Sequence, residues 1–213
     1  MLTPILLAAA MVSRTGIPYV TDEKAGPPDL VQAIKSRRPN GQLLNLDRML
    51  LHSPNYAKGW NGMFAAIRNQ LALPGNLREV AIMAIGVLNK ADYEWFQHEP
   101  EFLKAGGTQE QLAALKKLDP KPFNEAEKAT LQLTIEMTRN VQPKQATIDR
   151  VRKLLPDDQV VELMGTIAGY NMVSRFVVAT GLENETTKCA FRRRSGRGAG
   201  WRGRCRPRRP APG

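Results

Sequence analysis

The chain has 213 residues and a formal net charge of +11, and its length suits one domain with a sizeable core. Ten basic residues and no acid lie from Lys188 onward, which leaves a charge of +1 on the first 187 residues. The basic charge is therefore a property of the C-terminal tail, and it does not indicate nucleic-acid binding by the rest of the chain.

The two cysteines, Cys189 and Cys205, both lie in this tail. Their position excludes a disulfide framework, a CxxC redox pair and a thiolate metal site from residues 1–187. No apolar run reaches the ~20 residues that a membrane-spanning helix needs. The apolar run 4–11 has no basic residue before it, so we interpret residues 1–10 as an upstream extension and expect a cytoplasmic protein.

The chain divides into an irregular N-terminal extension (1–28), a helical domain (29–185) and the basic tail (186–213). Apolar residues recur at the helical period throughout the domain, and proline, glycine and capping residues separate the segments. No segment alternates with period two for long enough to indicate a strand. The predicted fold class is all-α, a single-domain bundle of about nine or ten helices. The expected helices cover 29–38, 43–52, 54–70, 77–88, 92–105, 108–118, 125–140, 147–155, 159–170 and a last segment that ends at Gly181.

One stretch, 78–107, contains the residues best suited to chemistry. Glu94 and His98 are four residues apart, so they share one face of the predicted helix 92–105 and can touch. Glu79 lies on the preceding helix among apolar residues. Two acids and a histidine that converge from two packed helices can transfer protons. The alternative is a solvated Glu94–His98 pair with Glu79 as a first-turn acid that the helix dipole favours.

The second histidine, His52, ends the helix 43–52. A histidine in that position interacts favourably with the helix dipole and needs no catalytic role. The alternative is a second histidine in the same pocket as His98.

The motif resembles the carboxymuconolactone decarboxylase family, which includes the alkylhydroperoxidase D-like peroxidases. The resemblance covers roughly residues 45 to 183 and rests on Arg78-Glu79, Glu94, His98, Ala105-Gly106 and the Thr108–Glu110 segment. The peroxidase branch carries C-x-x-C and then histidine, but the two cysteine positions here are Ala91 and Glu94. The decarboxylase branch carries E-x-x-x-H, which Glu94 and His98 match. The chain thus resembles the branch without the CxxC pair.

The resemblance implies a cofactor-free decarboxylase or related lyase that acts on a small carboxylated, lactone-like substrate. It implies that His98 donates the proton, Glu94 orients it and Glu79 supports it, without a metal ion. Tyr93 and Trp95 would then line the pocket. The family's closing Y-N-x-x-x-R pattern falls on Tyr170, Asn171 and Arg175. It suggests that Asn171 and Arg175 bind substrate, although Arg175 could instead form a salt bridge between subunits.

Two other functions stay open from the sequence. The first is membership of the peroxidase branch, which needs a thiolate nucleophile that this helical domain lacks. The second is a helical binding protein without catalytic activity. The expected partners are a small-molecule substrate and further copies of the chain in a trimer or larger homo-oligomer, with no membrane partner.

The tail 186–213 is rich in arginine, glycine and proline and has no apolar period, so we expect it to be disordered. Its composition changes abruptly after residue 183, as it does when GC-rich DNA is translated in a shifted frame. The alternatives are a neutral extension and an arm that binds nucleic acid through its arginines and Trp201.

Overall fold

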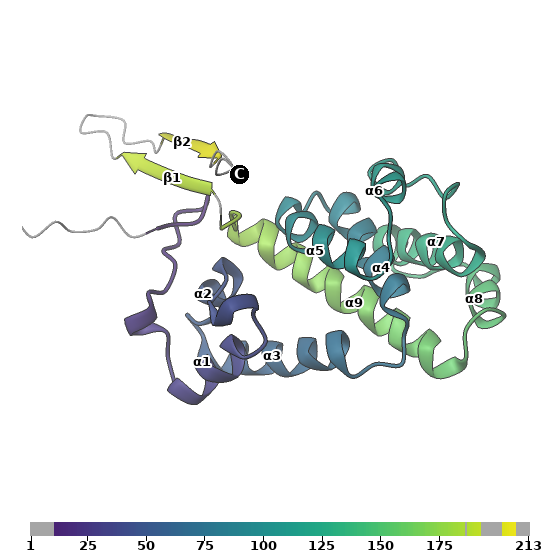
Figure 1. Cartoon of the computed structure of the whole chain (residues 1–213), viewed down its shortest axis with the longest axis horizontal. Coiled ribbons are helices and arrows are strands. Elements are labelled where there is room, and N and C mark those ends of the chain that lie inside the picture. The colour runs from purple at the N-terminus through teal and green to yellow at the C-terminus, as the bar shows by residue number, and fades with distance from the viewer. Residues whose placement is uncertain (1–10, 186, 193–201, 208–213) are drawn as a thin grey trace, which may run out of the picture. The chain divides into compact units, whose positions relative to one another are not determined.

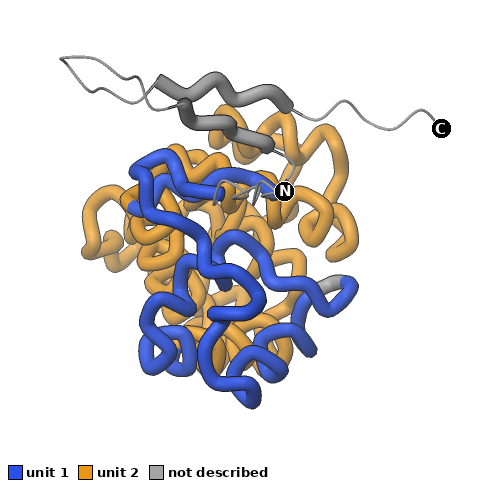
Figure 2. Tube along the Cα trace, turned by 90° about the vertical axis from the view of Figure 1, so that its left-hand side faces the viewer, with its two compact units in different colours: residues 1–59, 180–213 blue, residues 60–179 orange. Residues whose placement is uncertain are grey.

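The computed structural model describes residues 11–185, 187–192 and 202–207. The body of this described part is helical, as the sequence predicts (Figure 1), and no helix within it is long and apolar enough to cross a membrane. The chain forms two compact units, residues 1–59 with 180–213 and residues 60–179 (Figure 2). The residues that the sequence analysis singled out as a candidate site all fall in the second unit.

The first unit contains short helices that are fixed by buried polar contacts. It has the 3₁₀ turns η1 (Asp22–Lys24) and η2 (Pro39–Gly41), the helices α1 (Pro28–Lys35) and α2 (Asn45–Leu50), and the start of α3 (Pro54–Asn69). Asp47 accepts two hydrogen bonds from the guanidinium of Arg38, at 2.6 and 2.9 Å, and a third from the backbone of Leu44. One carboxylate therefore both caps α2 and neutralises a nearby arginine.

Residues 11–28 are packed against the segment after residue 180. The Thr15 hydroxyl donates to the carbonyl of Thr180, and the Tyr19 hydroxyl accepts from the backbone of Glu183. Gly181 has φ +64°, and a Cβ there would lie 2.9 Å from the Cβ of Arg14. Glycine is required at this turn both for its conformation and for the close approach of the N-terminal segment.

The second unit is built around α4 (Gly75–Leu88), whose residues from Glu79 to Gly86 are all buried. Such all-round burial is expected for a helix that is apolar on every face. Helix α4 packs against α5 (Asp92–Lys104) and α7 (Glu125–Asn140). The remaining helices are α6 (Gln109–Leu115), α8 (Gln145–Arg152) and α9 (Asp157–Thr180).

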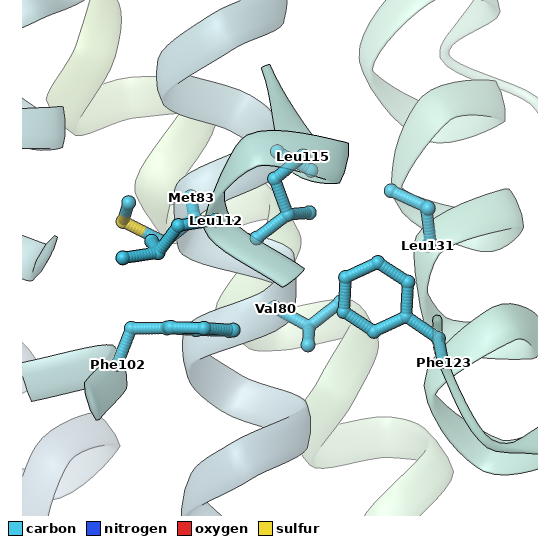
Figure 3. Packing of buried hydrophobic residues seen from close by; sticks show 8 residues of the cluster. Val80, Met83, Phe102, Leu112, Leu115, Phe123 and Leu131 are labelled. Atoms are coloured by element: carbon cyan, nitrogen blue, oxygen red, sulfur yellow. The ribbon is translucent and has the colours of Figure 1, made fainter. Parts of the chain in front are cut away.

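A hydrophobic cluster joins α4, α5, α6 and α7 in this unit. Figure 3 shows side chains from the different helices converging on Val80. The start of α5 lies close to Gly86 near the end of α4, where a Cβ would be in van der Waals contact, 3.6 Å from the backbone nitrogen of Trp95. The packing thereby brings the first turns of α5 directly against α4. The cluster consists of Val80, Met83, Ala84, Phe102, Leu112, Leu115, Phe123 and Leu131.

The structure corrects one expectation about the C-terminal part of the chain. The segments 159–170 and 170–181 form one 24-residue helix, α9. In the tail, β1 (Thr187–Arg192) pairs antiparallel with β2 (Arg202–Pro207), and disorder of the tail as a whole stays a prediction. Ladder pairing satisfies the backbone polar groups of these two segments. The rest of the tail, and residues 1–10, lie outside the described residues.

Candidate active site

His98 is held in place by a buried glutamate from the neighbouring helix. The Nδ1 atom of His98, on α5, lies 2.8 Å from Oε2 of Glu79 on α4. His98 is 4 % exposed and Glu79 is fully buried. An ionised carboxylate can only accept hydrogen bonds, so Nδ1 must donate. The neutral imidazole therefore carries its lone pair on Nε2, the atom left for chemistry.

Glu79 is ionised at neutral pH in this arrangement. Burial raises the pKa of Glu79, but the hydrogen bond from His98 and the charges of His98, Arg68 and Arg78 outweigh that effect and hold the pKa below its ordinary value. Arg78 contributes a contact of 3.2 Å from its Nε to the second carboxylate oxygen. Glu79 thus bridges the imidazole and a guanidinium.

The Nε2 atom of His98 has only long contacts to the charged groups around it. Glu94, one turn earlier on α5, places Oε2 3.8 Å away, and Arg68, in the last turn of α3, places a terminal nitrogen 3.5 Å away. In a well-formed hydrogen bond from an N–H group, the donor and acceptor atoms are about 2.9 Å apart. Nε2 is therefore near both charges without being tightly bound to either.

Arg68 connects this buried pair with the surface. Its side chain is 27 % exposed, and it lies 3.5 Å from Glu101. Burial lowers the pKa of Arg68, but Tyr170, Glu79 and Glu101 outweigh that effect, so its pKa lies above the ordinary value and the group stays charged. The backbone carbonyl of Arg68 accepts a hydrogen bond from Arg78, which fixes the end of α3 to the start of α4.

Tyr170, on α9, closes the site on a further side. Its ring meets the His98 ring edge-on, with centroids 5.2 Å apart. The residue is 3 % exposed, and burial raises the pKa of its hydroxyl well above the ordinary value, so it remains a neutral donor. The site therefore combines groups from four helices: Arg68 from α3, Glu79 from α4, Glu94 and His98 from α5, and Tyr170 from α9.

The residues expected to bind substrate lie on α5 and α9, and Trp95, Asn171 and Arg175 form contacts outside this cluster. Trp95 donates to Glu99 at 2.8 Å and packs on the hydrophobic cluster of Figure 3. Tyr93 is buried on α5, five residues before His98, on a different side of the helix.

Asn171 and Arg175 belong to a separate polar network. Asn171 contacts Asn89 and Thr138 at 3.0 Å, and Arg175 donates to the side chain and the carbonyl of Asn171. Successive residues of a helix are about 100° apart, so Asn171 cannot share the direction of Tyr170 toward His98. Arg175 is held on Asn171, outside the His98 cluster, and its binding of substrate stays a prediction.

Sequence reasoning missed two members of the cluster. Tyr170 stands in the Y-N-x-x-x-R pattern, but the pattern by itself points to Asn171 and Arg175 as the substrate-binding residues. Arg68 gives no motif signal. Its role depends on where α3 ends relative to α5, which only the tertiary structure determines.

Two further features of the described residues concern metal ligation and the second histidine, His52. Among the described residues, no three histidine, cysteine, aspartate or glutamate side chains are grouped so that they could hold a metal ion. His52 contacts the carbonyl oxygen of Pro18 at 2.7 Å in the first unit, which gives it a local structural role.

Residues 54–136, which include Glu79, Glu94 and His98, match the model of the carboxymuconolactone decarboxylase family. The match confirms the family resemblance found in the sequence. No curated protein matches the chain in sequence.

Solved structures show the same fold. One is an alkylhydroperoxidase AhpD core protein, an uncharacterized peroxidase-related protein from Ralstonia eutropha JMP134, with TM-score 0.72, 18 % identity, and coverage of 83 % of this chain and 94 % of that one. A peroxidase-related protein from Silicibacter sp. TM1040 has TM-score 0.68, 17 % identity and coverage of 84 % and 96 %. The debrominase Bmp8 has TM-score 0.67, 18 % identity and coverage of 78 % and 90 %. The chain has the alkylhydroperoxidase D-like fold.

Proposed function

We propose that this chain is a cofactor-free decarboxylase or related lyase in which His98 returns a proton to the carbon atom that loses CO₂. The observation that carries the proposal is the buried His98–Glu79 pair, whose free nitrogen lies beside Arg68 and Glu94. In such an arrangement the histidine, oriented by the carboxylate, can donate a proton, and the neighbouring guanidinium can stabilise an anion formed during the reaction.

The reaction needs an electron-accepting carbonyl group in the substrate, as in a carboxylated lactone or a β-keto acid. When the bond to the carboxylate breaks, its electron pair moves into the carbonyl and forms an enolate. Arg68 is placed to stabilise that oxygen anion, because its guanidinium lies 3.5 Å from the His98 nitrogen. The Nε2–H of protonated His98 then donates its proton to carbon, and the enolate becomes the carbonyl product.

Glu79 and Glu94 have different tasks in this scheme. Glu79 accepts the Nδ1 hydrogen in both charge states of the ring, so it fixes the ring's orientation and supports its positive charge. Glu94 lies on the Nε2 side, 3.8 Å away, where it is placed to pass a proton to that atom.

The direct experiment is a pooled screen of carboxylated lactones and β-keto acids for CO₂ release by the full chain. With a substrate in hand, Arg68→Met should lower kcat about 10²- to 10³-fold, the usual loss when one oxyanion donor is removed. Arg152→Met is the matched control, because Arg152 is exposed and pairs with Asp157. If Arg175→Met impairs turnover and Arg68→Met does not, the assignment of Arg68 is wrong.

The second candidate is hydroperoxide reduction, which the likeness to two peroxidase-related proteins favours. That activity uses a thiolate nucleophile. The positions that would hold the two cysteines are Ala91, which precedes α5, and Glu94. The proposed decarboxylase uses residues that are present in the helical unit, whereas the peroxidase would need a thiol from outside it.

A further inference from the structure

One face of α9 is apolar although it is exposed. It carries Val161, Gly165, Ala168 and Met172, and Val161 is 69 % and Met172 37 % exposed. Their spacing of four, three and four residues keeps them in one line along the helix. An exposed helix face is ordinarily polar, so an apolar line of this length indicates a surface that another helix covers.

The line ends in opposite charges. Asp158 lies three residues before Val161, and Arg175 lies three residues after Met172; both are exposed. The face therefore reads acid, large apolar, small, small, large apolar, base. The order is the same from either end, apart from the sign of the charge, which makes the surface complementary to itself.

We propose that α9 pairs antiparallel with α9 of a second copy of this chain, about a two-fold axis between Gly165 and Ala168. This register places Gly165 against Ala168 of the other copy and Val161 against its Met172. It also places Asp158 against the other copy's Arg175. In a two-fold interface each of these contacts occurs twice.

The packing and the charges both favour this pairing. A Cβ added to Gly165 would meet nothing within 4 Å, so the space in front of the central residues is open to an approaching helix. Small residues at the centre allow the two backbones to come close. A parallel arrangement would instead set Asp158 against Asp158 and Arg175 against Arg175, which like-charge repulsion disfavours.

Arg175 can make the new contact without losing its present one. Its terminal nitrogen NH1 donates to the carbonyl and side-chain oxygens of Asn171. A guanidinium has five N–H donors in a planar fork, so donors remain for a carboxylate. The inference does not depend on the proposed activity, because this face is on the other side of α9 from Tyr170.

The first test is the mass of the full chain in solution at micromolar concentration, by light scattering coupled to size exclusion. The expected mass is an even multiple of the 23.7 kDa chain. Ala168→Glu places a charge at the centre of the interface and should raise the dissociation constant at least about tenfold. Val141→Glu is the control, because Val141 is 83 % exposed and is the C-cap of α7, not a residue of the α9 face. A single-chain or trimeric mass, or an oligomer that Ala168→Glu leaves intact, would overturn the proposal.

A charge exchange tests the register itself and does not rely on the central substitution being tolerated. Asp158→Arg and Arg175→Asp should each weaken association about tenfold, since each sets like charges against one another twice. The double variant restores opposite charges and should return the dissociation constant to within about threefold of the original. Circular dichroism confirms that each variant is folded. A double variant that associates no better than the single ones would refute antiparallel pairing.

Discussion

Replacing Glu79 with glutamine keeps the shape of a fully buried side chain and removes its charge. The carboxylate now accepts from His98 Nδ1 at 2.8 Å with one oxygen and contacts Arg78 Nε at 3.2 Å with the other. An amide has a single oxygen, so it can keep one of these contacts and must turn its NH₂ group toward the other donor. The substitution therefore breaks one charge-assisted hydrogen bond inside the protein.

The size of the effect follows from that lost contact. Hydrogen bonds to charged groups contribute about 1.5–3 kcal/mol to stability. For a chain of this length, 1 kcal/mol corresponds to a shift in Tm of roughly 2–4 °C, so Glu79→Gln should lower Tm by roughly 3–12 °C at pH 7. Burial of the charged groups costs desolvation energy, which offsets part of this stabilisation. We therefore expect the loss in unfolding free energy to lie in the lower half of the range of about 1.5–3 kcal/mol.

The dependence on pH distinguishes this mechanism from a general packing defect. The folded-state pKa of Glu79 lies below its ordinary value of 4.5, so its ionised form stabilises the fold above that value. This contribution is lost as the pH falls through the folded-state pKa. The difference in stability between the original chain and Glu79→Gln should therefore be largest near neutral pH and should shrink as the pH falls below 4.5.

Urea unfolding at several pH values between 7 and 3 measures this difference. The matched control is Glu125→Gln, because Glu125 also forms ion pairs, with Lys128 and Arg150, but its side chain is 64 % exposed. Surface pairs contribute little, so the control should unfold like the original chain. Equal stability of Glu79→Gln and the original chain at pH 7, or a difference that does not change with pH, would refute the account of this pair.

Two further predictions concern packing and thiol chemistry. Gly107→Ala should destabilise the protein by about 1–3 kcal/mol in urea unfolding, because a Cβ there would lie 2.1 Å from the Phe102 ring. Gly62→Ala is the control: the space around Gly62 is open, so this substitution should stabilise α3 by about 1 kcal/mol. Equal effects of the two substitutions would contradict the packing described for Phe102. Peroxide reduction with a dithiol reductant should be absent, and activity that survives Cys189→Ser with Cys205→Ser would show that the thiolate argument is wrong.

The sequence predicted the helical fold because its signals are local. Capping residues and apolar periodicity mark where most helices begin and end, as at the Thr108 capping box of α6, which the structure contains. The sequence did not predict that the two segments 159–170 and 170–181 form one helix. The segments on either side of Tyr170 continue as one helix, and Gly169 within it brings α9 close to α3, since a Cβ there would lie 3.2 Å from the Ile67 side chain.

The candidate site was predictable only in part. Glu94 and His98 are linked by helical spacing, and Glu79 by the motif, so the sequence could bring these three together. Arg68 approaches from a helix that precedes His98 by 30 residues in the chain. No periodic signal reports such a contact, since it depends on how α3 packs near α5. Arg175 illustrates the same point: a motif identifies residues, but the phase of the helix decides the direction in which each side chain points.

Turnover by His98→Gln, compared with His52→Gln, is the decisive measurement for the proton-donating role proposed for His98. His52 is the other histidine of the chain, and it contacts the Pro18 carbonyl in the first unit. On a substrate that the CO₂ screen identifies, His98→Gln should lower kcat about 10²- to 10⁴-fold, the range for loss of a general acid. His52→Gln should retain the original rate. Full CO₂ release by folded His98→Gln would contradict the role assigned to His98 and, with it, the proposed chemistry.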